Sequence, residues 1–422
     1  MMRLSTSRSP FAHGRSFDIL YAGTLPPHPG GSAISAAQIL VGLAQRGHRV
    51  RAIGPITASG LQAGDQFALD HPEIRVIRFQ MPDFQTLPFL PAAEDYRQQE
   101  HAQVVRFLQD SIAERRPDIL FAGRETFAGY ITEVAARYSL PSILRVAGGT
   151  TLGLARGNYP ETLAEKLLAA LRRIDLLVSP GEHPRDLLNR LGVHNVDIIF
   201  NAVDTERFAP RPKDGALLHQ LNIATHSLVI GYVAGIHPRK RPLDLVASAA
   251  RLLPLAPNLT FLMVGEGISR AEVERTCEEL GIRDRFRFPG WVEYGRVPEY
   301  MNLMDIMVLP SDGEGLARVY LEAQALGKVL IASDIPPARE VVIAGETGLL
   351  FGLGDVQQLT DRILEAAHHP KLREDIGRKA RQAAEQHSIE AALSSYEQVL
   401  ERVIAEHHAK RPWSDSNARP TT

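Results

Sequence analysis

The 422-residue chain has a single cysteine, Cys277, and no long apolar run. One thiol can form neither an internal disulfide nor a cysteine-based zinc site, which favours a reducing compartment. The chain has no window of about 18 apolar residues, as a membrane-spanning helix would need. Its first sixteen residues lack the apolar region of a signal peptide. We therefore expect a cytoplasmic protein.

An excess of charge of one sign is also absent. The chain carries 47 basic and 49 acidic residues, a formal net charge of -2. This balance gives no bulk attraction to nucleic acid, and the 15 histidines form no recognisable metal-ligand pair. A hydrophobic content of 44% indicates a globular protein, and the length fits two domains of roughly 200 residues each.

Strand and helix patterns alternate from residue 17 onward. Residues 17–23 predict a buried strand and 24–31 a glycine-rich loop. Ser32 is expected to cap a helix that ends near Gly47, and residues 49–54 predict the next strand. This β-α-β order implies a parallel sheet with helices on its faces. Further strands are expected at residues 118–122, 142–146 and 175–179.

The rhythm breaks at residues 201–212 (NAVDTERFAPRP) and then restarts with six more strand patterns, the first at 228–234. The fold class is therefore α/β, with two doubly wound Rossmann-like domains facing across a cleft. We expect domains at 1–200 and 201–390. The C-terminal helix and loose tail, 391–422, either stay with the second domain or cross back to the first.

Two apolar segments leave alternatives open. Residues 73–93 predict an irregular stretch that carries Phe79, Phe84 and Leu90, and residues 160–173 predict an amphipathic helix. Each either packs in the core or docks a lipid-linked acceptor or a membrane surface. The second alternative would place the protein peripherally at the inner membrane face.

The most informative segment is 310–326, PSDGEGLARVYLEAQAL, which predicts a strand end, a turn and a helix beginning near Leu316. Amides of Gly315 and Leu316 at a helix start form an anion site. Helical spacing places Glu322 on one face with the apolar Val319. A carboxylate facing inward needs strong partners, either ribose hydroxyls or a nearby basic group.

The spacing of Glu314 and Glu322 is the E-x7-E motif, and the surrounding EGLARVYLEAQALGKVLIASDIPPAREVVIAGETGLLF resembles the signature of family 4 glycosyltransferases. Members of that family are retaining enzymes with the GT-B fold. The resemblance covers roughly residues 17–400 and is firm from Asn201 onward.

The resemblance implies roles for individual residues. Glu322 would bind the ribose hydroxyls of the donor, and Glu314 would face the donor sugar. Amides of Gly315 and Leu316 would hold the diphosphate or the sugar, and Lys240, in AGIHPRKRP, would bind the diphosphate. Glu314 and Lys240 are thus the expected catalytic residues. The resemblance also marks further donor-binding positions and a glycine turn in the N-terminal domain, namely Arg239, Arg241, Gly265, Gly267 and Val292, with Gly30 and Gly31 for the turn.

The chain departs from the family pattern at two positions. Gly235 stands where relatives have an arginine, and Arg239 or Arg241 are the candidates to replace it. Ala147 stands where many relatives have a histidine, followed by Gly148. Trp291, beside Val292, either packs in the core or lies in the segment that the family uses for the nucleobase.

The resemblance implies a retaining glycosyltransferase that moves a sugar from a nucleotide-diphosphate sugar to a sugar-containing, lipid-linked or small acceptor. No cofactor and no metal ion are expected, because cationic side chains can stabilise the departing diphosphate. The alternatives are a non-catalytic sugar-nucleotide-binding protein and a sugar-nucleotide epimerase on the same fold.

Overall fold

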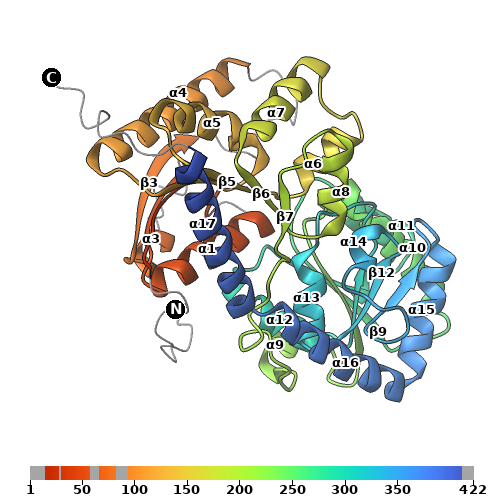
Figure 1. Ribbon diagram of the computed structural model, residues 1–422. Helices are drawn as coiled ribbons and strands as arrows, with labels where there is room; N and C mark the ends of the chain where they lie inside the picture. The colour runs from red at the N-terminus through yellow and green to blue at the C-terminus, as the bar shows by residue number, and fades with distance from the viewer. Residues whose placement is uncertain (1–14, 28–29, 58–65, 82–93, 411–422) are drawn as a thin grey trace, which may run out of the picture. The chain divides into compact units, whose positions relative to one another are not determined.

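The computed structural model describes residues 15–27, 30–57, 66–81 and 94–410 (Figure 1). The chain divides into two compact units. Unit 1 comprises 1–180, 184–199 and 392–422, and unit 2 comprises 181–183 and 200–391. None of the described helices is long and apolar enough to cross a membrane.

Unit 1 is built on a parallel sheet in the order β3-β2-β1-β4-β5-β6-β7. Its strands are β1 Asp18–Ala22, β2 Arg49–Thr57, β3 Ile74–Met81, β4 Ile119–Ala122, β5 Ser142–Arg145, β6 Leu176–Ser179 and β7 Val196–Ile198. The helices that lie mainly in this unit are α1 Gly31–Gln45, α3 Gln66–Asp70, α4 Glu94–Glu114, α5 Ala128–Tyr138, α6 Gly149–Ala155, α7 Glu161–Arg173, α8 Glu182–Arg190 and α17 Ile389–Lys410.

Unit 2 has a second parallel sheet, in the order β10-β9-β8-β11-β12-β13. Its strands are β8 Leu228–Val233, β9 Leu259–Val264, β10 Phe286–Gly290, β11 Ile306–Leu309, β12 Val329–Ser333 and β13 Leu349–Phe351. Its helices are α9 Gly215–Gln220, α10 Pro242–Leu252, α11 Arg270–Glu279, α12 Val297–Leu303, α13 Arg318–Ala325, α14 Pro336–Arg339, α15 Val356–His368 and α16 Pro370–Ala384. The expected pair of doubly wound parallel sheets is confirmed.

Alternate residues of each strand face opposite sides of the sheet, as strand geometry requires. In unit 1, Leu20 and Leu120 join the core that α4 and α5 cover. On the other face, the Phe121 ring lies 6.0 Å from the Tyr396 ring of α17. Figure 1 shows α17 beside α1, where the Glu397 carboxylate accepts a 2.7 Å bond from Arg46. The C-terminal helix thus completes the layer on this face.

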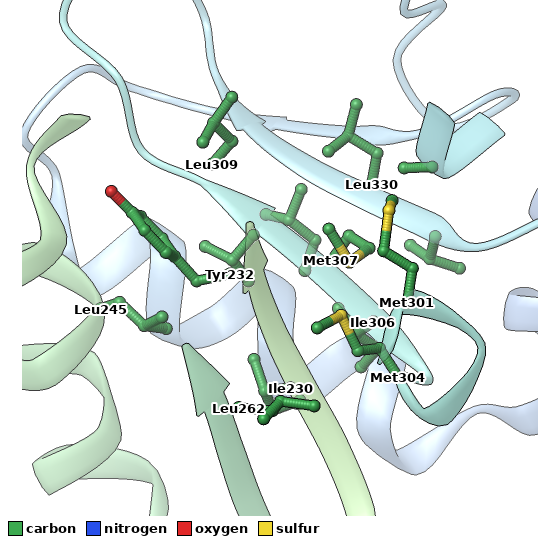
Figure 2. Close-up of a cluster of buried hydrophobic side chains, with 14 of the residues drawn as sticks. Ile230, Tyr232, Leu245, Leu262, Met301, Met304, Ile306, Met307, Leu309 and Leu330 are labelled. Carbon is green, nitrogen blue, oxygen red and sulfur yellow. The ribbon is translucent and has the colours of Figure 1, made fainter. Parts of the chain in front are cut away.

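The core of unit 2 fixes the relative position of its two central strands, β8 and β11. Figure 2 shows Ile230 and Tyr232 of β8 in the same buried cluster as Met304, Ile306 and Met307, and Ile306 of β11 is paired with Ile230. Gly231 of β8 leaves room for this packing, because a Cβ there would lie 2.0 Å from the Met304 sulfur. Burying each large apolar side chain stabilises the fold by about 1.5–3 kcal/mol. The loops that follow β8 and β11 therefore begin at strands whose positions are fixed by the core.

Two local expectations are wrong. Ser32 does not cap α1, because the helix begins at Gly31, with Gly30, two residues before Ser32, in the N-cap position and no side-chain cap. The stretch at 73–93 is not irregular throughout, since Ile74–Met81 forms β3 and Phe79 is buried beside Phe107. Phe84 and Leu90 lie outside the described residues.

The amphipathic helix at 160–173 exists as α7, Glu161–Arg173. Its apolar face packs inward, with Leu171 buried and Leu167 and Leu168 against the core of unit 1. The core-packing alternative for this segment is therefore the one observed.

Candidate functional site

The strand order of unit 2 reverses between β8 and β11, and open α/β sheets bind ligands outside the carboxyl ends of the strands at such a switch point. The loop after β8 carries Arg239 and Lys240 in the short helix η2, Pro238–Lys240, and the loop after β11 carries Glu314. A backbone hydrogen bond of 2.9 Å from the Asp312 amide to the Arg239 carbonyl joins the two loops.

The two loops also meet through an ion-paired cluster at Glu314. This carboxylate is buried and accepts hydrogen bonds from Lys240 Nζ at Oε1 and from Arg239 Nη1 at Oε2, the latter at 3.3 Å. Burial raises the pKa of Glu314, but the charges of Lys240 and Arg239 outweigh it, so that the pKa lies below its ordinary value. Glu314 is therefore a carboxylate at neutral pH and can only accept hydrogen bonds.

Backbone amides lie beside this cluster. The helix α13 begins at Arg318, two residues later than expected, so Gly315 and Leu316 belong to the turn before it. Among the hydrogen bonds of the described residues, none is donated by the amides of these two residues. The Leu316 carbonyl accepts a 2.8 Å bond from Asn201, which holds the turn in place. The arrangement offers N–H donors and a helix dipole to an anion.

Glu322 lies inside α13 and is buried, as its apolar neighbours predicted. Its Oε1 accepts hydrogen bonds from the Tyr294 hydroxyl at 3.0 Å and from Arg318 at 3.3 Å. The expected alternative of a basic partner is thus observed, one turn earlier on the same helix. The i,i+4 spacing of Arg318 and Glu322 is a signal in the sequence that could have identified this pair.

Gly265 and Gly267 follow β9 and allow a close approach of two backbones. Gly265 has φ +142°, and a Cβ there would lie 2.0 Å from the Ala234 carbonyl oxygen. At Gly267 a Cβ would lie 2.3 Å from the Ile236 carbonyl oxygen. Both positions therefore require glycine, because the loop after β9 packs closely against the loop after β8 at these two points.

The candidates to replace the arginine absent at Gly235 differ in their partners. Arg241 forms an ion pair with Asp244, at 2.7 Å, at the start of α10. Arg239 instead lies in the Glu314 cluster. His237, which the sequence analysis did not single out, adjoins these cations. Burial and then the charges of Arg239 and Lys240 lower its pKa.

Val292 packs partly against the core of unit 2, after β10 ends at Gly290. The packing alternative for its neighbour Trp291 is wrong, because 62% of this residue is exposed. Ile268, in the loop after the adjacent β9, is 81% exposed. Both apolar residues follow neighbouring strands of the same sheet.

In unit 1, the predicted glycine turn leads into α1. Gly30 has φ +113°, with open space where a Cβ would be, and Gly31 is the first helical residue. At the departure from the family pattern, the amides of Ala147 and Gly148 both donate 3.1 Å hydrogen bonds to Glu125. The Glu125 carboxylate also accepts from the amide and hydroxyl of Thr151. No motif in the sequence pointed to this fully buried carboxylate.

Two family models match the chain. Residues 30–204 match the model described as "Glycosyl transferase 4-like domain", and residues 216–383 match "Glycosyl transferases group 1". Among curated proteins, a 2-deoxystreptamine N-acetyl-D-glucosaminyltransferase of Streptomyces fradiae is 30% identical over 210 residues, 48% of this chain and 50% of the relative. A D-inositol 3-phosphate glycosyltransferase of Kribbella flavida is 27% identical over 273 residues, 60% of this chain and 64% of the relative. The matches thus span about half to two-thirds of these relatives.

Solved structures share the fold over nearly the whole chain. The structure of HepE from Anabaena in complex with UDP and glucose has a TM-score of 0.76 and 20% identity, covering 91% of this chain and 99% of HepE. Sucrose-phosphate synthase from Thermosynechococcus elongatus has a TM-score of 0.77 and 20% identity, covering 92% and 100%. The two family models, with the E-x7-E segment on the strand–turn–helix unit at β11 and α13, show that the chain belongs to the family 4 glycosyltransferases, and the solved structures show its GT-B fold.

Proposed function

We propose that the protein transfers a sugar from a nucleoside diphosphate sugar to an acceptor hydroxyl, with retention of anomeric configuration and without a metal ion. The observation that carries the proposal is the cluster of Lys240, Arg239 and Glu314 beside the amides of Gly315 and Leu316. The cations and N–H donors that a departing diphosphate needs converge at one switch point of one sheet.

The chemistry that follows begins with charge separation. As the bond from the sugar to the diphosphate breaks, negative charge collects on the phosphate oxygens. Lys240, Arg239 and the helix dipole at α13 stabilise that charge in a partly buried place, where such interactions are strong. Glu314 keeps both cations oriented, and as an ionised acceptor it can also take a hydrogen bond from a sugar hydroxyl.

Glu322 is the proposed ribose ligand. Its carboxylate is already oriented by Tyr294 and Arg318, so little side-chain entropy remains to be lost on binding. A carboxylate matches the two donors of a ribose diol. The exposed Trp291 and Ile268 lie on neighbouring loops of the same sheet and suit the base or the outer part of the donor.

We infer retention without a protein nucleophile, because Glu125, the buried carboxylate noted at the carboxyl edge of the sheet in unit 1, already has hydrogen-bond partners among the described residues. All the hydrogen bonds of Glu125 described above are directed to the start of α6, Gly149–Ala155. We propose that the leaving phosphate deprotonates the acceptor on the face from which it departs.

The test is a transfer assay with a panel of nucleoside diphosphate sugars. UDP-sugars come first because the related HepE structures contain UDP and UDP-glucose. The proposal predicts a glycoside product whose anomeric configuration, read by NMR, equals that of the donor, with full activity in excess chelator. An inverted product would contradict retention, and activity restored only by added metal would contradict metal independence.

The same assay separates the alternatives. An epimerase would release free sugar or an epimeric sugar nucleotide in the absence of acceptor. A binding protein would bind the nucleotide sugar and leave it unchanged. Either result would replace the transferase proposal.

A further inference from the structure

The strand order in unit 1 reverses between β1 and β4, and two arginines lie at the carboxyl ends of β4 and its neighbour β5. Arg145 is the last residue of β5, and Arg124 follows β4 by two residues. The strands are paired, with Ala122 opposite Leu144. The arginines thus stand at the place where open α/β sheets bind ligands.

Arg124 has a buried hydrogen-bond donor for which such a ligand would provide the acceptor. Its Nε is buried and has no hydrogen-bond partner among the residues that the structure describes. A buried charged N–H without an acceptor is costly, because the desolvated donor has lost its bond to water and gained none in return. An oxyanion is the acceptor that a guanidinium binds best, because its planar donors match two oxygens at once.

The groups beside Arg124 and Arg145 do not neutralise the positive charge of these two side chains. Arg145 is buried and bonds to the phenol of Tyr396, near the phenol of Tyr21. Burial raises the pKa of both phenols, that of Tyr396 to about 12, so neither supplies a negative charge at neutral pH. The adjacent carboxylate, Glu125, accepts its hydrogen bonds from the backbone and hydroxyl donors of residues 147–151.

The turns after β1 and β4 each begin with a glycine, whose missing side chain leaves space at this edge of the sheet. Gly23 follows β1 and Gly123 follows β4, and a Cβ at Gly123 would lie 1.9 Å from the Tyr21 hydroxyl oxygen. That hydroxyl donates a 3.1 Å bond to the Thr24 carbonyl, which holds the turn after β1 against the Tyr21 side chain. A third cation, Arg78, reaches this edge by bonding to the Pro26 carbonyl.

We propose that Arg124 and Arg145 bind an anionic group of the acceptor, a phosphate or a carboxylate, and so select small hydroxylated acids or phosphate esters as substrates. This inference rests on the proposed transferase function for the word acceptor. The anion site itself is a property of unit 1 and can be tested without any sugar transfer.

The binding test uses inorganic phosphate and malonate as probes, titrated by calorimetry into the 422-residue chain in a Lys240→Ala background, which is expected to weaken anion binding at unit 2. We expect Arg124→Gln to weaken one or both probes roughly 10- to 100-fold, the loss of one or two charge-assisted hydrogen bonds. Preference for phosphate or for malonate tells which anion the site takes. Arg124→Lys should lose less than Arg124→Gln.

The matched control is Arg106→Gln, which makes the same charge change on the exposed surface of α4. Unchanged dissociation constants in Arg124→Gln would overturn the proposal, and so would an equal loss in Arg106→Gln. Thermal melting of Arg124→Gln checks that it is folded, and the Arg124→Lys variant provides the comparison if it is not.

The acceptor test compares glycerol 3-phosphate with glycerol, and glycerate as the carboxylate, using otherwise wild-type protein with an active donor. We expect Arg124→Gln to raise KM for the anionic acceptors with little change in kcat and to leave the kinetics with glycerol unaffected. Preference for glycerol over both anions would overturn the anion site while leaving the transferase intact. Binding of phosphate without transfer from any donor would instead contradict the proposed function.

Discussion

The two switch points of this molecule are built on the same topology but use their carboxylates in opposite ways. At β8 and β11 in unit 2, Glu314 pairs with two cations, Lys240 and Arg239. At β1 and β4 in unit 1, Glu125 caps backbone amides and Arg124 keeps a buried N–H without a partner among the described residues. One site has its cations held by a protein carboxylate, and the other keeps cationic donors for a ligand.

The two carboxylates are therefore expected to have different roles, Glu314 in catalysis and Glu125 in stability. The cluster at Glu314 orients charges that a diphosphate would use, so its loss should appear in catalysis. The cap formed by Glu125 satisfies the start of α6, so its loss should appear in folding. The following variants test whether that division holds.

Removing Lys240, one of the two cations at the switch point of unit 2, should have the largest effect on activity. Lys240→Ala is expected to lower kcat by roughly 10²–10³-fold, or about 2.7–4 kcal/mol, because a donor to the leaving diphosphate is lost. Steady-state rates at saturating donor measure this. Lys379→Ala, an exposed lysine of α16 whose only described contact is Glu346, is the control. A loss below threefold in Lys240→Ala would assign the cluster to structure alone.

A change at Glu322, the proposed ligand of the ribose, should affect donor binding more than the rate of the transfer step. Glu322→Gln keeps the shape but loses the charge, and we expect KM for the nucleotide sugar to rise roughly 10- to 100-fold. Because Arg318 then loses its ionic partner, melting curves must accompany the kinetics. Glu299→Gln, a half-exposed carboxylate of α12, is the matched control. Unchanged KM in Glu322→Gln would contradict the ribose assignment.

A change at Glu125, the buried carboxylate of unit 1, should affect stability rather than donor binding. Glu125→Ala leaves the amides of Ala147 and Gly148 without their acceptor, and we expect a loss of about 1–3 kcal/mol in the free energy of unfolding. Nucleotide binding by the folded protein should stay as in wild type. Denaturant titration checks the first point, with the exposed Glu133→Ala as control. A fully stable Glu125→Ala protein would remove the capping role.

The pH dependence should be the smallest effect. The pKa of Glu314 is lowered in the folded state, so its charge contributes stability above the unfolded pKa, and this contribution is lost as pH falls through the folded pKa. The difference in unfolding free energy between wild type and Glu314→Gln should therefore shrink as pH falls below about 4.5, the ordinary carboxyl value. A difference that grows on acidification would contradict the ion-pair description.

Sequence patterns foretold the architecture well where strands are apolar and followed by helices. They missed β3, whose two arginines, Arg75 and Arg78, break the apolar pattern between neighbouring prolines, and β7, which has only three residues. Both strands are identified by their neighbours in the sheet, which a local pattern does not contain. The E-x7-E segment located Glu314 and Glu322, because its spacing is local to one turn and one helix.

The partners of these residues were harder to foresee. Arg318 was within reach through its i,i+4 spacing to Glu322, whereas Tyr294 comes from a segment 28 residues away and carries no motif. Arg124 and Glu125 depend on how β4, β5 and α6 meet in unit 1. Their significance comes from burial and from an unmatched N–H, which only three-dimensional positions show.

Whether the switch point of unit 2 is the donor site is tested by calorimetric titration of the 422-residue chain with UDP, and with other nucleoside diphosphates in parallel, comparing wild type with Lys240→Ala and with Lys379→Ala. We expect one nucleoside diphosphate to bind wild type and Lys379→Ala equally and Lys240→Ala at least tenfold more weakly. If no nucleoside diphosphate binds wild type, or if Lys240→Ala binds as tightly as wild type, the switch point of unit 2 is not the donor site.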